Sequence, residues 1–204
     1  MIRREHMKRF FYPLIAVIPL MLLTSCFFGP SLLFFDRDAD GKPNLIPDGD
    51  FEIAHQTGNQ TPNSWMFLSN FDYRNAISWD SLFVQNGKKS LMIKYPEQKV
   101  LLVSESFPID NRSAYLNRCF VRSKYPSITP VVMYFRTFDK IGARKDNFTS
   151  KLKSNSTWNE ILLSTGFFKP NAQFARVIIS IPMDKDNIYW IDNIGSYHVH
   201  TFTR

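Results

Sequence analysis

Three aspartates at alternating positions are the residues of this 204-residue chain best spaced to bind an ion. Asp36, Asp38 and Asp40, followed by Gly41, have the spacing of the first half of a calcium-binding loop. A glutamate that binds through both oxygens should stand at the twelfth position, but Pro47 is there instead. We therefore expect at most a weak calcium site in this segment.

The chain lacks the common catalytic motifs. It contains no Gly-x-Ser-x-Gly, no His-Glu-x-x-His, no glycine-rich phosphate loop and no Cys-x-x-Cys. His198 and His200 lie two positions apart, so one strand face could present both to a metal, although histidines near a terminus are more often simply exposed. No pair of carboxylates is favoured for glycoside hydrolysis. We therefore expect that the protein is not an enzyme.

The elements that must position these residues begin after an export signal. Four basic residues precede an uncharged run over 10–35, and Thr24 and Ser25 come directly before Cys26. The run Leu-Thr-Ser-Cys resembles the lipobox of bacterial lipoproteins, which implies cleavage before Cys26 and a lipid on its sulfur. The expected organisation is a signal peptide over 1–25, a lipidated tether over 26–43 and one domain over 44–204.

A second interpretation of the N-terminus stays open. The uncharged run from Phe10 holds 26 residues, which exceeds the ~20 that a transmembrane helix needs, and its basic end would lie in the cytoplasm. Pro13 and Pro19 interrupt the run. Either interpretation exports the rest of the chain and attaches it to a membrane. We therefore expect localisation in the bacterial cell envelope, facing the periplasm or the exterior.

Composition limits the partners of the chain. The formal net charge of +7 falls to +4 when the signal's four basic residues and one acidic residue are removed, an excess too small to indicate nucleic acid. The only cysteines are Cys26 and Cys119, so no internal disulfide can form once Cys26 carries a lipid. Cys119 lies in an apolar pattern and should pack as a small hydrophobic residue.

Short apolar or alternating runs follow Leu45, divided by glycine, proline, asparagine and aspartate. Their spacing of roughly 8 to 12 residues is typical of an all-β sandwich or barrel, and no capped amphipathic helix is evident. We predict a single antiparallel β-sandwich. The expected strands are 45–53, 77–84, 90–95, 100–107, 114–122, 131–138, 149–153, 158–163, 176–181, 188–191 and 195–202.

The order of several motifs resembles a known family. The motifs are the turn-rich segment 44–52, Trp65, the hairpin 86–93, Tyr115, the strand and turn 131–142, Trp158 with the segment 167–170, and the closing segment 189–194. In order and spacing they are similar to the galactose-binding-like jelly-roll modules that bind carbohydrate in bacterial glycanases. The resemblance covers about residues 44–200 and implies an antiparallel jelly-roll β-sandwich. Trp65, Trp158 and Trp190 fall where aromatic residues cap or fill a sandwich core, and we expect them to pack rather than to contact a ligand.

The resemblance also implies a structural calcium ion where the first and last strands meet. The family's carboxylate ligands correspond to Glu52 and Asp192, and its backbone carbonyls come from the hairpin near Gly87 and Lys89. Calcium prefers six to eight hard oxygens, which carboxylates and carbonyls supply. The alternative is that both acids are ordinary exposed residues at strand ends.

Binding of a sugar would need aromatic rings against the sugar faces and polar groups around them. The candidate ligand-binding residues are Tyr73, Trp79, Arg118, Arg122, Tyr134 and Arg136. Arg118 and Arg122 come from one predicted strand, and Tyr134 and Arg136 come from the next predicted strand. If all share one sheet face, that face would suit an acidic glycan, because guanidinium groups pair with carboxylates through two hydrogen bonds. The apolar alternation does not decide which face is buried, so ordinary surface and core positions are the alternative.

Two hypotheses about function follow. The first is a noncatalytic glycan-binding lipoprotein, with calcium stabilising the fold and a lipid attaching it to the membrane. The second is a structural or adhesion lipoprotein that contacts protein or other envelope components through the same sandwich. A sandwich fold by itself supports either role.

Overall fold

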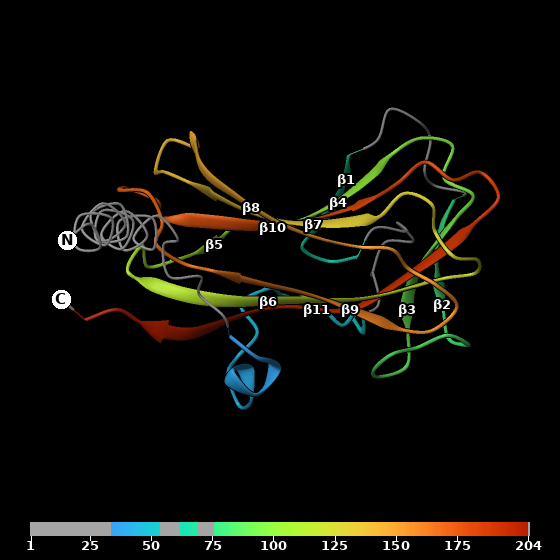
Figure 1. Cartoon of the computed structure of the whole chain (residues 1–204), viewed down its shortest axis with the longest axis horizontal. Coiled ribbons are helices and arrows are strands. Elements are labelled where there is room, and N and C mark those ends of the chain that lie inside the picture. The colour runs from blue at the N-terminus through green and yellow to red at the C-terminus, as the bar shows by residue number, and fades with distance from the viewer. Residues whose placement is uncertain (1–33, 54–61, 69–75, 204) are drawn as a thin grey trace, which may run out of the picture. The chain divides into compact units, whose positions relative to one another are not determined.

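A computed structural model describes residues 34–53, 62–68 and 76–203 of the chain (Figure 1). The predictions for Cys26 and Tyr73 lie outside these residues. Phe34–Arg204 forms one compact unit. The strands of this unit are β1 (Trp65–Leu68), β2 (Ile77–Asp80), β3 (Ser90–Lys94), β4 (Val100–Ser104), β5 (Phe107–Pro108), β6 (Ser113–Ser123), β7 (Val131–Phe138), β8 (Arg144–Leu152), β9 (Asn159–Thr165), β10 (Phe174–Ile181) and β11 (Ile188–Thr201).

Two antiparallel sheets pack face to face. Sheet A has the order β1-β4-β10-β7-β8, with β5 also paired to β10, and sheet B has the order β2-β3-β11-β6-β9. The chain passes repeatedly from one sheet to the other, for example between β3 and β4, between β6 and β7, and between β10 and β11. This connectivity is that of a jelly roll, so the predicted antiparallel jelly-roll β-sandwich is confirmed.

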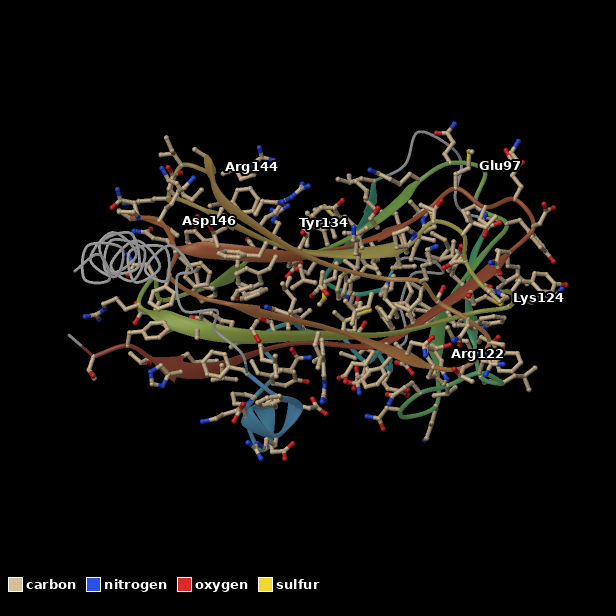
Figure 2. All side chains as sticks on the ribbon, viewed as in Figure 1. Glu97, Arg122, Lys124, Tyr134, Arg144 and Asp146 are labelled. Atoms are coloured by element: carbon tan, nitrogen blue, oxygen red, sulfur yellow. The ribbon has the colours of Figure 1, made fainter. Side chains whose placement is uncertain are left out.

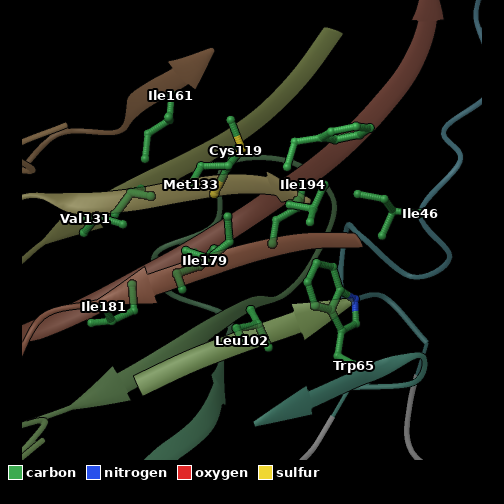
Figure 3. Close-up of a cluster of buried hydrophobic side chains, with 14 of the residues drawn as sticks. Ile46, Trp65, Leu102, Cys119, Val131, Met133, Ile161, Ile179, Ile181 and Ile194 are labelled. Carbon is green, nitrogen blue, oxygen red and sulfur yellow. The ribbon is translucent and has the colours of Figure 1, made fainter. Parts of the chain in front are cut away.

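The core lies between the sheets and follows from alternation along the strands. In β7 every second residue is buried, namely Val131, Met133, Phe135 and Thr137. The ring of Phe135 lies 5.8–6.4 Å from the rings of its four aromatic neighbours, Phe107, Tyr115, Phe148 and Phe168. Figure 3 shows aliphatic side chains of both sheets meeting around Met133 and Ile179.

Two of the residues predicted to pack as hydrophobic groups do so. Cys119 is fully buried, and this burial raises the pKa of its thiol well above the usual value. Trp65 is buried in the core and donates a hydrogen bond from its indole nitrogen to the carbonyl of Asp48, at 3.1 Å. Trp158, in contrast, is only half-buried.

The predicted strand over 45–53 is absent, and the segment forms turns instead. Asp48 and Phe51 have φ angles of 48° and 57°, in the left-handed region, which interrupts the extended backbone of a regular strand. Phe51 nevertheless inserts its ring fully into the core. The apolar residues of this segment therefore pack without joining a sheet.

The predicted tether is partly incorporated into the domain. Residues 34–43 lie on the outer face of sheet B, where Ala39 packs against Leu116 and Tyr197. The backbone nitrogen of Phe34 donates to the hydroxyl of Ser164 at 3.1 Å. The domain thus begins ten residues before the predicted boundary at residue 44.

The Asp36–Ala39 segment forms a 3-10 turn, labelled η2. Asp36 forms an ion pair with Arg118, and Asp38 accepts a hydrogen bond from the backbone nitrogen of Phe35. These carboxylates therefore hold the turn and the sheet rather than pointing to a common centre. In the described part of the chain, no helix is long and apolar enough to cross a membrane.

Candidate functional site

The outer face of sheet A presents an aromatic ring and an arginine on β7, next to the central strand β10. Tyr134 and Arg136 occupy the β7 positions that alternate with the buried ones, so their side chains point away from sheet B. The guanidinium carbon of Arg136 lies 4.9 Å from the centroid of the Tyr134 ring, within the range of a cation–π contact. Its Nε donates to Oδ1 of Asn147 on β8 at 2.8 Å. The ring and the guanidinium group are thus held together.

Strand β10 adds a second arginine beside this pair. Arg176 is the cross-strand neighbour of Arg136, and Phe174 is the neighbour of Phe138. Two positively charged side chains that face each other across neighbouring strands repel each other. An anion bound over both arginines would reduce this repulsion. At this end of the sheet a cavity of about 300 Å³ is lined by Ser106, Phe138, Asp139, Lys140, Gly142, Phe174 and Arg176.

The negative charge of Asp139, the acid in this cavity, is neutralised by a lysine that does not line the cavity. Lys145 lies 2.8 Å from Oδ2 of Asp139 and, as the largest cause, holds the pKa of that carboxyl below its usual value. Lys140 and Arg176 therefore dominate the charge of the cavity. Sequence reasoning missed Arg176, Phe138 and Phe174, because the pairing of β7 with β10 joins residues some forty positions apart, which no local pattern reveals.

The predicted common face of four residues is wrong. Arg118 and Arg122 are on β6 in sheet B, whereas Tyr134 and Arg136 are on β7 in sheet A. The connection between β6 and β7 crosses from one sheet to the other, so strands adjacent in the sequence are not adjacent in space. In Figure 2, Tyr134 lies on the outer side of sheet A and Arg122 on the outer side of sheet B.

The two arginines of sheet B are engaged in contacts within the domain. Arg122 lies with its guanidinium carbon 4.1 Å from the ring centroid of Phe83 and 5.8 Å from that of Trp190. Trp190 is buried, but on the outer face of sheet B beside Arg122, and its indole nitrogen donates to Oδ2 of Asp80 at 2.6 Å. Arg118 bonds to Asp36 at 2.9 Å and lies over the ring of Tyr197.

Trp79, another predicted ligand-binding residue, lies at the core side of sheet B. It is the cross-strand neighbour of the fully buried Leu91 and packs against the core, with its ring 6.0 Å from that of Phe51. The side chain of Trp79 on β2 therefore points toward the core. The ring packs against the core and remains partly exposed.

The two acids predicted to bind calcium meet at one loop. Oε1 of Glu52 accepts hydrogen bonds from the backbone nitrogens of Lys88 and Lys89, at 2.6 and 2.9 Å. Oδ2 of Asp192 accepts from those of Gln85 and Asn86, at 2.8 and 3.1 Å. The structure therefore brings Glu52 and Asp192 to the hairpin that contains Gly87 and Lys89. The contacts of Glu52 there are with the amide hydrogens of Lys88 and Lys89 and not with the predicted carbonyls.

Burial makes Asp192 the more unusual of these two acids. It is fully buried, and burial raises the pKa of its carboxyl to about 6, with a smaller contribution from the charge of Glu52. Backbone hydrogen bonds only partly offset this cost. Two neighbouring hard carboxylates are suitable ligands for calcium. Within the described residues, however, no three histidine, cysteine or acidic side chains gather as a metal site, so further oxygens would have to come from the backbone or water.

A second cavity, of about 440 Å³, lies on the outer face of sheet B. Its lining comes mainly from the segment 39–50, together with Arg118, Asn193 and Tyr197 from the sheet and Asn86 from the loop before β3. Sequence reasoning could not anticipate this cavity, because it treated 26–43 as a tether. The cavity is separated from Tyr134 and Arg136 by the full thickness of the sandwich.

Comparison with known proteins supports the fold. No protein-family model and no curated protein matches the chain. The solved structure of a family 16 carbohydrate-binding module-2 has a TM-score of 0.55 at 13% identity, covering 76% of this chain and 100% of that one. TmCBM61, solved in complex with β-1,4-galactotriose, has a TM-score of 0.53 at 9% identity, covering 76% and 99%.

An enzyme also contains this fold. The enzymatically active domain of tailspike protein 4 from bacteriophage CBA120 has a TM-score of 0.56 at 16% identity, and the match covers 76% of this chain but only 21% of that one. The predicted resemblance to carbohydrate-binding modules is confirmed at the level of the fold. At such identities the comparisons bear on the fold alone.

Proposed function

We propose that this protein is a noncatalytic glycan-binding lipoprotein whose ligand lies on the outer face of sheet A. The observation that carries the proposal is the contact between Tyr134 and Arg136 on that face. A tyrosine ring offers an apolar surface to a sugar ring, and the adjacent guanidinium group offers hydrogen-bond donors to its oxygens. Solved carbohydrate-binding modules with the same sandwich support this assignment.

The glycan is acidic in this proposal. Arg136 and Arg176 are cross-strand neighbours, and Lys140 lines the cavity next to them. Carboxylate or sulfate groups of a uronic acid or a sulfated sugar would pair with the guanidinium groups through charge-assisted hydrogen bonds. The phenylalanines at the cavity, Phe138 and Phe174, would contact the apolar faces of the same residues.

A glycan array tests this proposal. The fragment 34–204 is applied to neutral, uronic-acid-containing and sulfated glycans, together with the variants Tyr134→Ala and Arg136→Gln. We expect binding to acidic glycans, weakened about tenfold or more by either substitution. Arg122→Gln is the matched control, because it removes an arginine from sheet B and should leave binding unchanged.

Each other result has a definite meaning. Binding restricted to neutral glycans would retain the face and refute the acidic ligand. No binding by a fragment that unfolds cooperatively would refute the glycan function and favour the protein-binding alternative. Equal effects of Arg122→Gln and Arg136→Gln would place the site elsewhere.

The membrane attachment rests on Cys26. We infer that this cysteine becomes the lipidated first residue of the mature protein, because a basic segment, an apolar segment and two small residues precede it. In bacteria that express the full chain, metabolic labelling with palmitate should label the parent and not Cys26→Ser. A parent that stays unlabelled and keeps its first 25 residues would favour the uncleaved transmembrane anchor.

Calcium, if bound, would be held by Glu52 and Asp192 at the loop of residues 85–89. The ion would supply positive charge to two acids that otherwise repel each other, and would fix the loop to the last strand. The role proposed for it is structural, since this loop belongs to sheet B and the proposed glycan face belongs to sheet A.

A further inference from the structure

We propose that the end of the sandwich at which residue 34 lies rests on the lipid bilayer through a ladder of four aromatic rings. The ring ladder consists of Phe34, His200, Phe202 and Phe167. Successive ring centroids lie 6.4, 5.0 and 4.6 Å apart, in that order. The rings come from three separate segments of the chain, so the fold assembles them into one continuous surface.

One member of the ladder is held outward at an energetic cost. Phe167 is 60% exposed and has a φ angle of 53°, in the left-handed region. For a residue with a bulky side chain this conformation is unfavourable. The next residue, Phe168, is buried in the core. The chain thus directs one of two adjacent phenylalanine rings into solvent, where it stacks on Phe202 and adds nothing to the core.

The surroundings of the ladder combine apolar and basic groups. β6 begins, and β7 and β11 end, at this end of the sandwich. The β7–β8 turn there exposes Ile141, and Lys140 and Lys169 are exposed nearby. Of the acids at this end, Asp110 and Asp139 form ion pairs with Arg112 and Lys145, and Asp146 accepts hydrogen bonds from the Thr137 hydroxyl and the backbone nitrogen of Lys169. Aromatic rings rimmed by cations are suited to the interface of an anionic membrane.

The position of Phe34 in the chain selects the bilayer as the partner, and this step rests on the membrane attachment proposed above. Cys26 precedes Phe34 by eight residues, which span at most about 28 Å when fully extended. The residues between them are uncharged. The end that carries the ring ladder therefore cannot leave the vicinity of the membrane, while the opposite end can.

The test supplies the attachment chemically, so it does not depend on Cys26. The fragment 34–204, which contains the whole compact unit, carries a histidine tag ahead of Phe34. It is bound to vesicles of phosphatidylethanolamine, phosphatidylglycerol and a nickel-chelating lipid. An environment-sensitive fluorophore is attached at Thr203→Cys, beside the ladder, or at Thr129→Cys, in the loop at the opposite end. Cys119 is fully buried and stays unlabelled.

Quenching by a lipid that carries a nitroxide near its headgroup is then measured. We expect several-fold stronger quenching at position 203 than at position 129, and loss of most of that excess when Phe167→Ala and Phe202→Ala are combined. Phe167→Ser alone, at an exposed position, should lower it in part without affecting folding. The matched control combines Leu82→Ala and Met183→Ala, which remove exposed apolar side chains elsewhere and should change nothing.

Two results would overturn the proposal. One is quenching at position 203 that is unaffected by removal of the rings, which would mean that the tag alone brings this end close to the lipid. The other is equal quenching at the two positions. Neither result would affect the glycan-binding proposal, because the glycan array is carried out without vesicles.

Discussion

At the scale of single residues, Asp192 carries the clearest electrostatic signature. Its pKa is raised from 3.8 to about 6 by burial, so the folded state binds its proton more tightly than the unfolded state does. The free energy of unfolding should therefore be highest below pH 4 and fall by about 3 kcal/mol as the pH rises through 6. Urea unfolding in calcium-free buffer between pH 4 and 7 measures this fall.

Two comparisons give that measurement its meaning. Asp192→Asn lacks the titrating group and should not show this component of the pH dependence. Saturating calcium binds the deprotonated carboxylate and should abolish the fall in the parent, if the proposed ion is real. Calcium that leaves the parent's curve unchanged would refute the metal site. Identical curves for the parent and Asp192→Asn would refute the raised pKa.

A pair of glycines tests the contact between Glu52 and its loop. Gly87 and Gly142 both have left-handed φ angles, of 76° and 84°. A β-carbon on Gly87 would overlap the carboxylate of Glu52, whereas one on Gly142 would meet no atom within 4 Å. Gly142→Ala should thus cost only the backbone conformation, about 1 kcal/mol. Gly87→Ala should cost clearly more.

Thermal or urea unfolding of the two alanine variants measures this difference. Glu52→Gln in the Gly87→Ala background provides the control, because the overlap persists while the charge is removed. Equal destabilisation by the two glycine substitutions would show that Glu52 moves aside freely and does not define the loop.

At the scale of elements, the segment 34–43 is part of the domain. Ala39 covers Leu116 and Tyr197, which are otherwise on the outer face of sheet B. A fragment that begins at residue 44 should lose about 2 kcal/mol of unfolding free energy relative to one that begins at residue 34, because it exposes this cluster. Asp36→Ala removes only an ion pair whose acid is half-exposed and should cost at most about 1 kcal/mol.

Chemical denaturation of the three proteins distinguishes packing from charge. If Asp36→Ala destabilises as strongly as the deletion, the ion pair with Arg118 holds the segment. If the fragment that begins at residue 44 is as stable as the longer one, the segment is a tether, as its sequence suggested.

The sequence patterns predicted some elements better than others, and burial explains the difference. β7 alternates between buried and half-buried residues along its whole length, and its predicted bounds are correct. β8 is an edge strand with no fully buried residue, so only its last part stood out from the surrounding polar sequence. The segment 45–53 has the apolar content of a strand, but turn-forming residues at 47–50 control its backbone.

At the scale of the whole molecule, the ordered set of turns and aromatic residues was sufficient to predict the jelly roll. It was not sufficient to predict the composition of a face. Arg118 and Tyr134 are sixteen residues apart but lie on opposite sheets, while Arg136 and Arg176 are forty apart and adjacent. Which residues share a face depends on which strands become neighbours after folding. The local periodicity of the sequence does not predict those neighbours.

The last two strands to be synthesised occupy the middle of both sheets. β10 lies between β4 and β7, and β11 lies between β3 and β6. Neither sheet can close until residues 174–201 have left the ribosome, so the growing chain has no stable folded intermediate with a complete sheet. A polypeptide built in this order cannot complete either sheet before β11 has been synthesised, which would suit the passage of an unfolded chain through a narrow translocation channel in the export proposed above.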